Sequence, residues 1–192
     1  NDGNVNNLDW IGPLSRFSKL EHQPGNVMDQ SKKTIDISVV LSGPEPSRSQ
    51  FEKKVIEVLQ ERQEKVVLVR GVTKSQARFT HQNLTIHNFM LADEREKLIG
   101  QSRLLVLRSG YSSIMDLHAL GARALLVPTP GQSEQEYLAE RMSEKGWYPT
   151  VKQSEFGWNS IQEALEYPWT ETKKTSKKID YSPLFDVFLQ EN

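Results

Sequence analysis

Short apolar runs that alternate with segments of helical periodicity constrain the fold of this chain more than any other feature. The runs are continuous rather than alternating with polar residues, which is typical of strands covered on both faces by helices. Strands are predicted over Ile35–Leu41, Val66–Val69, Leu84–Phe89, Arg103–Leu107 and Ala124–Val127. Helices are predicted at about 47–64, 93–101, 112–120 and 133–145. Strand–helix units of this spacing form right-handed crossovers. The sequence therefore predicts an α/β fold with a doubly wound parallel sheet and helices on both faces.

The two ends of the chain carry weaker patterns. Residues 1–34 are polar and irregular, and we expect them to form a segment that crosses into the main domain. Residues 35–167 are predicted to form that domain, with a further helix within 154–167. Residues 168–192 are expected to form a charged loop and a C-terminal helix that docks back onto the domain.

The composition excludes several classes of protein. Lys and Arg number 24 against 25 Asp and Glu, a formal net charge of −1, which argues against affinity based on many nucleic-acid phosphates. No apolar run approaches the roughly 20 residues that span a bilayer. Cysteine is absent, which excludes disulfides, thiolate metal sites and cysteine nucleophiles. The chain starts with Asn rather than Met and carries no signal-peptide pattern, so we expect a cytoplasmic, processed fragment.

The richest candidate site is the turn after the strand that ends at Leu107. Arg108, Ser109 and Gly110 lead from this strand into a helix whose first turn carries Ser112 and Ser113. Free backbone N–H groups at such a helix start favour an anion, and hydroxyl groups add hydrogen bonds. Asp116, one turn later, is placed to accept hydrogen bonds from sugar hydroxyls. The alternative is that a serine caps the helix and Gly110 only makes the turn.

A second candidate lies after the strand that ends at Val127. A Pro/Gly turn leads into a helix start that carries Gln132, Ser133, Gln135 and Glu136. Amides and carboxylates at the mouth of a cleft suit a polyhydroxylated ligand. The alternative is a capping box between Ser133 and Glu136. Both interpretations are compatible, because one face of the first turn can cap while the other binds.

Other chemistry has little support in the sequence. The four histidines show no metal-ligand spacing, and there is no Asp-x-Asp pair, so neither a metal nor a cofactor is expected. A Walker loop, a Gly-x-Gly-x-x-Gly motif and a Gly-x-Ser-x-Gly elbow are all missing.

These loops together resemble the C-terminal, nucleotide-sugar-binding half of a GT-B glycosyltransferase. The likeness is to glycosyltransferase family 28, the type found in the bacterial N-acetylglucosaminyltransferase that forms lipid II. The most specific match is Arg108–Pro128, and Pro130–Ala139 continues it in register. Asn88–Leu91 resembles the strand end that binds the base, and Trp10–Arg16 resembles the segment between the two domains. The resemblance implies a Rossmann-like half of a GT-B fold.

The resemblance also implies roles by position. The Phe89–Met90 segment would hold the nucleobase, with the Met90 backbone bonding uracil. Asp116 would take the ribose hydroxyls, where the family usually has Glu, and Arg16 would contact phosphates. The implied nucleotide-sugar site comprises Arg16, Phe89, Met90, Arg108, Ser109, Gly110, Tyr111, Ser112, Ser113, Asp116, Gln132, Gln135 and Glu136. The diphosphate would lie at the turn within this set, and no catalytic residue is assigned.

Two departures from the family pattern bear on the ligand. Gln135 and Glu136 stand where the family often has a Gln-Gln pair facing the donor sugar, and a carboxylate can only accept hydrogen bonds. The glycine-rich first loop is replaced by Ser42–Pro46, whose two prolines remove amide donors.

The resemblance implies the UDP-sugar-binding half of an inverting glycosyltransferase of the hexosyltransferase type. We expect this fragment to lack the N-terminal acceptor domain and to be inactive alone. The acceptor would be a glycan or a lipid-linked glycan, which suggests that the complete protein contacts the inner face of the membrane. Two alternatives remain, a nucleotide-sugar 2-epimerase-like domain and a non-catalytic nucleotide-binding module.

Overall fold

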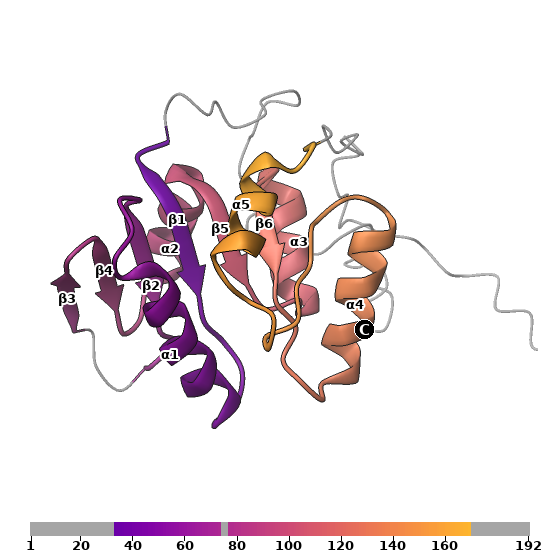
Figure 1. Cartoon of the computed structure of the whole chain (residues 1–192), viewed down its shortest axis with the longest axis horizontal. Coiled ribbons are helices and arrows are strands. Elements are labelled where there is room, and N and C mark those ends of the chain that lie inside the picture. The colour runs from indigo at the N-terminus through magenta and orange to yellow at the C-terminus, as the bar shows by residue number, and fades with distance from the viewer. Residues whose placement is uncertain (1–32, 74–76, 170–192) are drawn as a thin grey trace, which may run out of the picture.

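The computed structural model describes residues 33–73 and 77–169 (Figure 1). The strands are β1 (Ile35–Val40), β2 (Val66–Val69), β3 (Arg78–His81), β4 (Leu84–His87), β5 (Ser102–Leu107) and β6 (Ala124–Leu126). The helices are α1 (Ser47–Leu59), α2 (Ala92–Gln101), α3 (Tyr111–Leu120), α4 (Ser133–Glu144) and α5 (Trp158–Glu166). Two predicted segments lie almost wholly outside the described residues, which include only the last two residues of 1–34 and the first two of 168–192.

The strands form one sheet in the order β3-β4-β2-β1-β5-β6. Five strands are parallel, as predicted, and the doubly wound α/β class is confirmed. The sheet is nevertheless mixed, because β3 pairs antiparallel with β4 through the turn at Gln82, whose φ is 51°. Strand β3 was not predicted, because all four of its residues are exposed and leave no apolar pattern.

Helices cover both faces of the sheet, as the continuous apolar runs predicted (Figure 1). On one face Ile37 and Val39 of β1 pack in a core with residues of α1 and α5. On the other face Leu105 and Leu107 of β5 pack with residues of α3 and α4. A third cluster places Leu98 of α2 against β2 on this second face. Each central strand is therefore buried on both sides, which explains its lack of polar alternation.

Two predicted boundaries are wrong. Helix α1 ends at Leu59 rather than near residue 64, and the Asn83 side chain donates hydrogen bonds to the carbonyls of Leu59 (2.9 Å) and Glu64 (2.8 Å). An amide side chain from a distant segment thus satisfies a carbonyl at the helix end. Strand β4 ends at His87 rather than Phe89, which leaves Asn88 to begin a loop.

The direction in which the chain adds strands reverses between β1 and β5. From β1 the chain runs outward through β2 to the edge strand β3, turns back into β4, and then crosses through α2 to β5 on the other side of β1. Open α/β sheets bind ligands beyond the carboxyl ends of the strands at such a reversal. The fold therefore directs attention to the loops after β1 and β5.

Among the residues that the structure describes, no helix is long and apolar enough to cross a membrane.

Candidate functional site

The turn between β5 and α3 presents an open helix start at the carboxyl edge of the sheet. Gly110 is the N-cap of α3, with φ −72° and ψ 150°, and among the described residues no side chain caps the helix. The first amide groups of a helix have no acceptor within it, and they form its positive end. Tyr111 and Ser112 are exposed there. The alternative in which a serine caps this helix is wrong, and the backbone at Gly110 is one that any residue adopts.

Arg108 points into the protein instead of toward this turn. Its guanidinium donates to the carbonyls of Val127 and Pro128 (both 3.1 Å) and to Gln153 Oε1 (2.7 Å). It also lies 4.5 Å from the centre of the Phe51 ring, a cation–π contact. Burial lowers the pKa of Arg108 to about 10, so the group remains a cation at neutral pH. This geometry favours a structural role for Arg108, one that joins β5, β6 and the segment around Gln153.

Ser109 is also buried and hydrogen-bonded within the protein. Its hydroxyl donates to the carbonyl of Gln135 (2.7 Å), which ties the β5–α3 turn to the start of α4. The Gln135 side chain in turn accepts from the Thr129 amide (2.9 Å) and donates to Gln132 Oε1. Glutamines predicted to face a sugar therefore also order the loop between β6 and α4.

The capping box predicted at the start of α4 is not formed. The N-cap is Gln132 rather than Ser133, and Glu136 accepts instead from the Gly131 amide (3.0 Å). Gly131 has a φ of 78°, so the turn before α4 folds back toward the Glu136 carboxylate. Glu136 itself is exposed at the edge of a cleft.

Asp116 lies beside a small cavity at the reversal point of the sheet. This cavity, of about 50 Å³, is lined by Val40 of β1, Leu107 of β5, Ser113 and Asp116 of α3 and Arg95 of α2, among others. Asp116 is only 7% exposed. Arg95 is not among the residues predicted for the site. Its place in the helix that directly follows the predicted base-binding segment is the signal that would have found it.

Phe89 and Met90 follow β4 and lead into α2. Met90 is buried against Val69 and Leu98, and Phe89 is half-buried. The next residue, Leu91, donates its amide to Glu94 Oε2 (2.8 Å) at the start of α2. The described residues thus place this segment on the same sheet edge as the β5–α3 turn. Arg16, the remaining residue of the predicted site, lies outside the described residues.

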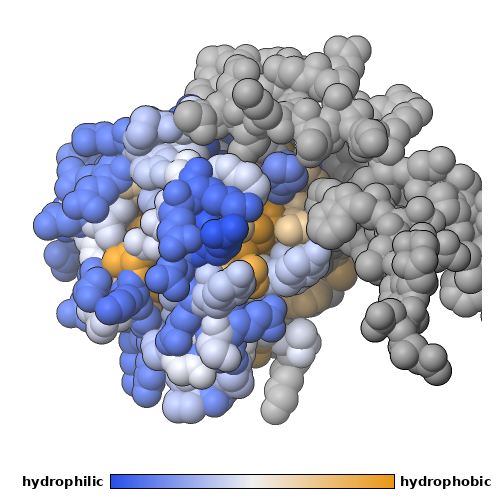
Figure 2. Space-filling view, turned by 90° about the vertical axis from the view of Figure 1, so that its right-hand side faces the viewer, coloured by the Kyte–Doolittle hydropathy of each residue, from blue (hydrophilic) through white to orange (hydrophobic). Residues whose placement is uncertain are grey.

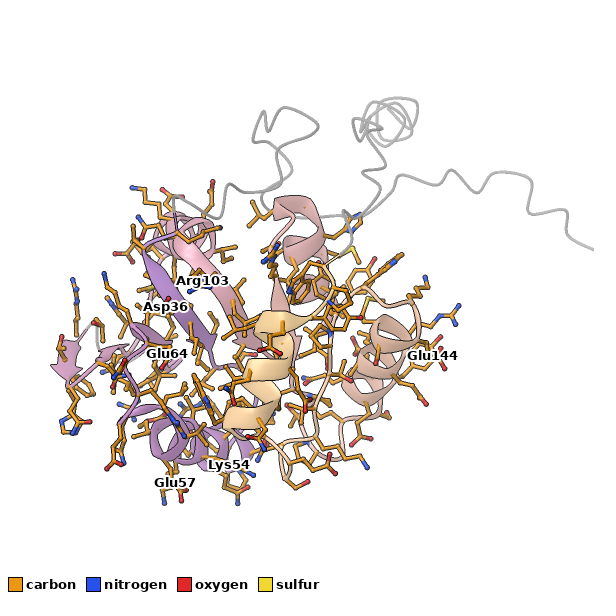
Figure 3. The ribbon with its side chains drawn as sticks, turned by 45° about the horizontal axis from the view of Figure 1, so that its top comes forward. Asp36, Lys54, Glu57, Glu64, Arg103 and Glu144 are labelled. Carbon is orange, nitrogen blue, oxygen red and sulfur yellow. The ribbon has the colours of Figure 1, made fainter. Side chains whose placement is uncertain are left out.

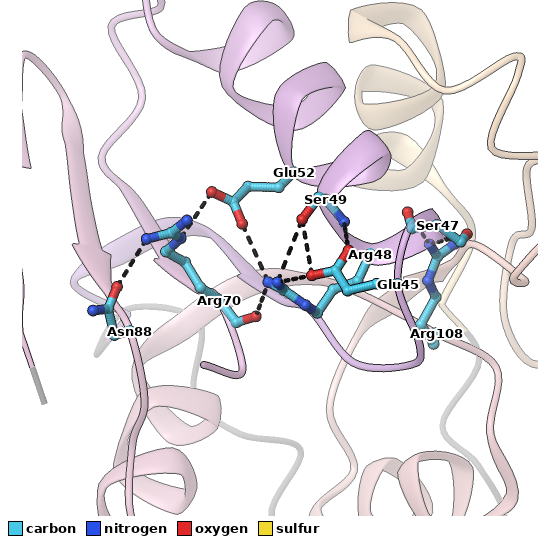
Figure 4. A network of polar contacts seen from close by, with 8 residues as sticks. All are labelled: Glu45, Ser47, Arg48, Ser49, Glu52, Arg70, Asn88 and Arg108. Carbon is cyan, nitrogen blue, oxygen red and sulfur yellow. Dashed lines mark hydrogen bonds and ion pairs between the residues drawn. The ribbon is translucent and has the colours of Figure 1, made fainter. Parts of the chain in front are cut away.

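The loop between β1 and α1 closes its helix start with its own carboxylate. Glu45 Oε2 accepts from the Ser49 amide (3.2 Å) and Oε1 from the Ser49 hydroxyl (2.9 Å), and Arg48 pairs with the same carboxylate (Figure 4). The Ser49 hydroxyl bond and the Arg48 contacts hold the pKa of Glu45 below its ordinary value. The Glu45 carboxylate therefore occupies the position at the start of α1 where a bound phosphate would accept hydrogen bonds from the helix amides.

A cleft of about 1090 Å³ lies between α1, α4 and residues 150–155. Lys54 of α1 and Glu144 of α4 line it from its two sides (Figure 3). Figure 2 turns the side of the molecule that carries α4 toward the viewer, and most of its described residues are hydrophilic, with smaller hydrophobic patches between them. Glu136 lines this cleft rather than the cavity beside Asp116.

The histidines offer no metal centre in the described part of the chain. No group of three His, Asp or Glu side chains there could hold a metal ion. Burial lowers the pKa of His87 and of His118, which favours neutral imidazoles. His118 stacks on Trp147 with ring centres 6.1 Å apart, a packing role rather than a place in the site.

Comparison with known proteins places this geometry in a family. The model of the glycosyltransferase family 28 C-terminal domain matches residues 39–182. No curated protein sequence matches the chain.

Several solved structures share the fold. The chain is similar to the glycotransferase of kitacinnamycin, with 18% identity and a TM-score of 0.56 over 95% of this chain and 45% of that one. It is also similar to MurG of Acinetobacter baumannii, with 15% identity and a TM-score of 0.56 over 95% of this chain and 55% of that one. CalG4, the calicheamicin glycosyltransferase, is similar over 82% of this chain and 39% of its own length, with 19% identity and a TM-score of 0.56. The chain thus spans about half the length of the first two. Since the family model matches most of the chain and these structures share its fold, the chain belongs to the family of glycosyltransferase family 28 C-terminal domains.

Proposed function

We propose that this chain is the donor-binding half of an inverting glycosyltransferase that uses a UDP-sugar. The observation that carries the proposal is the uncapped start of α3 beside the cavity that holds Asp116, at the reversal point of the sheet. Family membership supports a glycosyltransferase function in general. UDP as the nucleotide, a hexose as the transferred sugar and inversion at the anomeric carbon are parts of the proposal.

The proposed site divides the nucleotide among three segments. The main chain at Phe89 and Met90 binds uracil, and Asp116 accepts hydrogen bonds from the ribose hydroxyls. The α3 amides from Tyr111 to Ser113 bind the diphosphate. Because negative charge develops on the diphosphate as the sugar leaves, these preorganised donors would stabilise the transition state more than the bound substrate.

The donor sugar would extend toward the start of α4. Gln132, Gln135 and Glu136 are the side chains proposed to face it, and each of them also holds a hydrogen bond within this loop. The acceptor, a glycan or a lipid-linked glycan, would be bound by a second domain. Contact of the complete protein with the cytoplasmic face of a membrane is part of the same proposal.

A titration of the 192-residue chain with UDP, ADP and GDP tests the nucleotide. We expect selective binding of UDP, weakened about 10- to 100-fold in Asp116→Ala because two hydrogen bonds to a charged group are lost, roughly 1.5–3 kcal/mol. Glu57→Ala removes an exposed carboxylate from α1 and is the matched control (Figure 3). Equal affinity for the three nucleotides, or unchanged affinity in Asp116→Ala, would contradict the proposed site.

A non-catalytic nucleotide-binding module is the second candidate, and one observation favours it. Glu45 occupies the helix start of α1, at the loop where the family has a glycine-rich segment. Both candidates predict UDP binding, so the discriminating measurement is transfer by the complete protein. Sugar transferred to an added acceptor supports the first candidate, whereas binding of UDP-sugar without transfer or hydrolysis supports the second.

A further inference from the structure

A chain of polar contacts joins three loops at the carboxyl edge of the sheet (Figure 4). It runs from Arg48 and Glu52 of α1 through Arg70, just after β2, to Asn88, just after β4. None of these residues belongs to the proposed nucleotide contacts. The network therefore has a role other than direct contact with the nucleotide.

Arg70 is the centre of this network. Its Nε donates to Glu52 Oε1 (2.7 Å) and its Nη1 to Asn88 Oδ1 (3.0 Å). Glu52 and Asn88 are 9% and 8% exposed, so both acceptors are held away from water. A guanidinium presents its donors in a rigid plane, and bonds that involve charged groups are stronger than neutral ones. Arg70 thus fixes the distance and angle between α1 and the Asn88 side chain.

Further hydrogen bonds hold the backbone around these two residues. The Arg70 amide donates to the His87 carbonyl (2.8 Å), and the Arg70 carbonyl accepts from Arg48 Nη1 (2.9 Å). The Asn88 carbonyl accepts from the Val72 amide (2.7 Å). The Asn88 amide donates to the Ala77 carbonyl (3.0 Å). The Asn88 side chain is therefore held by Arg70, whereas its main chain is held by Val72 and Ala77.

Asn88 is the residue directly before Phe89 and Met90. A shift of Asn88 also moves the main-chain groups of the two residues that follow it. Such a shift weakens their hydrogen bonds to a base, because hydrogen bonds weaken steeply as their angle departs from linear. The same shift has little effect on α3, whose amides belong to a different loop. The contacts of Arg70 thus bear on one part of the proposed site only.

We propose that Arg70 is a positioning residue for nucleobase recognition. Through Asn88 it holds the Phe89–Met90 main chain where the base is read, and through Glu52 it anchors that segment to α1. The inference rests on the proposed function and adds the residue that would set its base specificity.

The test compares nucleotides that differ only in the base. The dissociation constants of UDP and GDP are measured by calorimetry for the 192-residue chain, for Arg70→Met and for Asn88→Leu. We expect the preference for UDP over GDP to fall about tenfold in both variants, through weaker UDP binding. Asn88→Asp keeps an oxygen acceptor for Arg70 and is expected to retain the preference.

Arg103→Met is the matched control. It removes the cation of another ion pair, that of Arg103 with Asp36 (3.1 Å), which joins β5 to β1 at their amino ends (Figure 3). We expect it to leave the base preference unchanged. Hydrogen exchange supplies a readout without ligand: Arg70→Met should expose amides in the peptide around Asn88 while those at the start of α3 keep their protection.

The outcomes separate this inference from the proposed function. Equal weakening of UDP and GDP in Arg70→Met, or no weakening, overturns the positioning role while UDP selectivity of the unaltered chain stands. Faster exchange throughout the sheet would also overturn it, because that result indicates general destabilisation. A chain that does not distinguish UDP from GDP before any substitution overturns both.

Discussion

Two helices start at the same edge of the sheet, and they treat their positive ends in opposite ways. At α1 the Glu45 carboxylate accepts from the Ser49 amide, and Arg48 pairs with the same carboxylate. At α3 no side chain from the described part of the chain caps the helix, and the N-cap Gly110 has no side chain that could do so. Both loops follow central, parallel strands, so position in the fold alone does not distinguish them. The difference teaches that two helix starts in equivalent places can differ in whether a side chain already accepts from their first amides. Only α3 meets this requirement of the proposed diphosphate site.

The largest expected effect concerns the support beneath the α3 turn. Arg108→Met removes the donors that satisfy the carbonyls of Val127 and Pro128 and the contact with Gln153, so we expect a loss of about 3 kcal/mol in the free energy of unfolding. Urea unfolding measures it, with the exposed Arg103→Met as the control. Below its melting temperature the variant should bind UDP within about threefold of the original chain. A collapse of UDP affinity in the folded variant would instead make Arg108 a ligand contact.

A carboxylate placed at the start of α3 would make this helix resemble α1. In Ser112→Asp we expect the dissociation constant of UDP to rise at least about 30-fold, roughly 2 kcal/mol, through repulsion of the diphosphate. The same acidic residue should raise helix stability by about 0.3–1 kcal/mol, because it faces the positive end of the dipole. Calorimetry and thermal unfolding measure the two changes, and Ser112→Asn is the uncharged control. Affinity that survives the aspartate would place the diphosphate elsewhere.

The reverse experiment removes the charge from the start of α1. Glu45→Gln keeps an oxygen acceptor for Ser49 but loses the anion, so we expect its melting temperature to fall by a few degrees at pH 7. Because the folded pKa of Glu45 lies below its ordinary value, its contribution is complete above that ordinary value and is lost as the pH falls through the lowered one. The difference in melting temperature between the original chain and Glu45→Gln should therefore disappear on acidification, as thermal scans at several pH values would show. A difference in melting temperature that grows as the pH falls would contradict this account of the loop.

The smallest expected change in stability is at Gly110. A Cβ added there meets no atom within 4 Å, and its φ of −72° suits any residue, so Gly110→Ala should alter the free energy of unfolding by about 0.5 kcal/mol or less. If phosphate oxygens approach this backbone, the added methyl group should weaken UDP binding several-fold. Calorimetry on the variant decides this, and unchanged affinity would mean that the diphosphate does not touch the turn.

The sequence predicts most of the fold because the buried strands leave a strong pattern. Runs such as Val66–Val69 are apolar on both faces, and four of the five predicted strands end within one residue of their observed ends. The exception, Leu84–His87, is predicted two residues too long. Strand β3 escapes prediction because an exposed edge strand needs no apolar residues.

The site was harder to predict because its geometry depends on contacts between distant segments. The motif at 108–113 marks a turn that the structure places at the reversal point of the sheet. Nothing local shows that the Arg108 side chain turns inward to Val127, Pro128 and Gln153. The bond from Arg70 to Asn88 likewise depends on the pairing of β2 with β4. Motifs identify candidate loops, whereas the partners of each side chain follow only from the assembled sheet.

The pairing of β1 with β5 has a consequence for how the molecule forms. These neighbours come from distant parts of the chain, with Ile35 opposite Ser102. Closing so long a loop costs conformational entropy before the contacts between β1 and β5 can form. The cavity between these two strands therefore forms late in folding. A nucleotide bound across that boundary would hold together the two parts of the sheet that meet last. Ligand binding should therefore slow unfolding as well as raise the melting temperature.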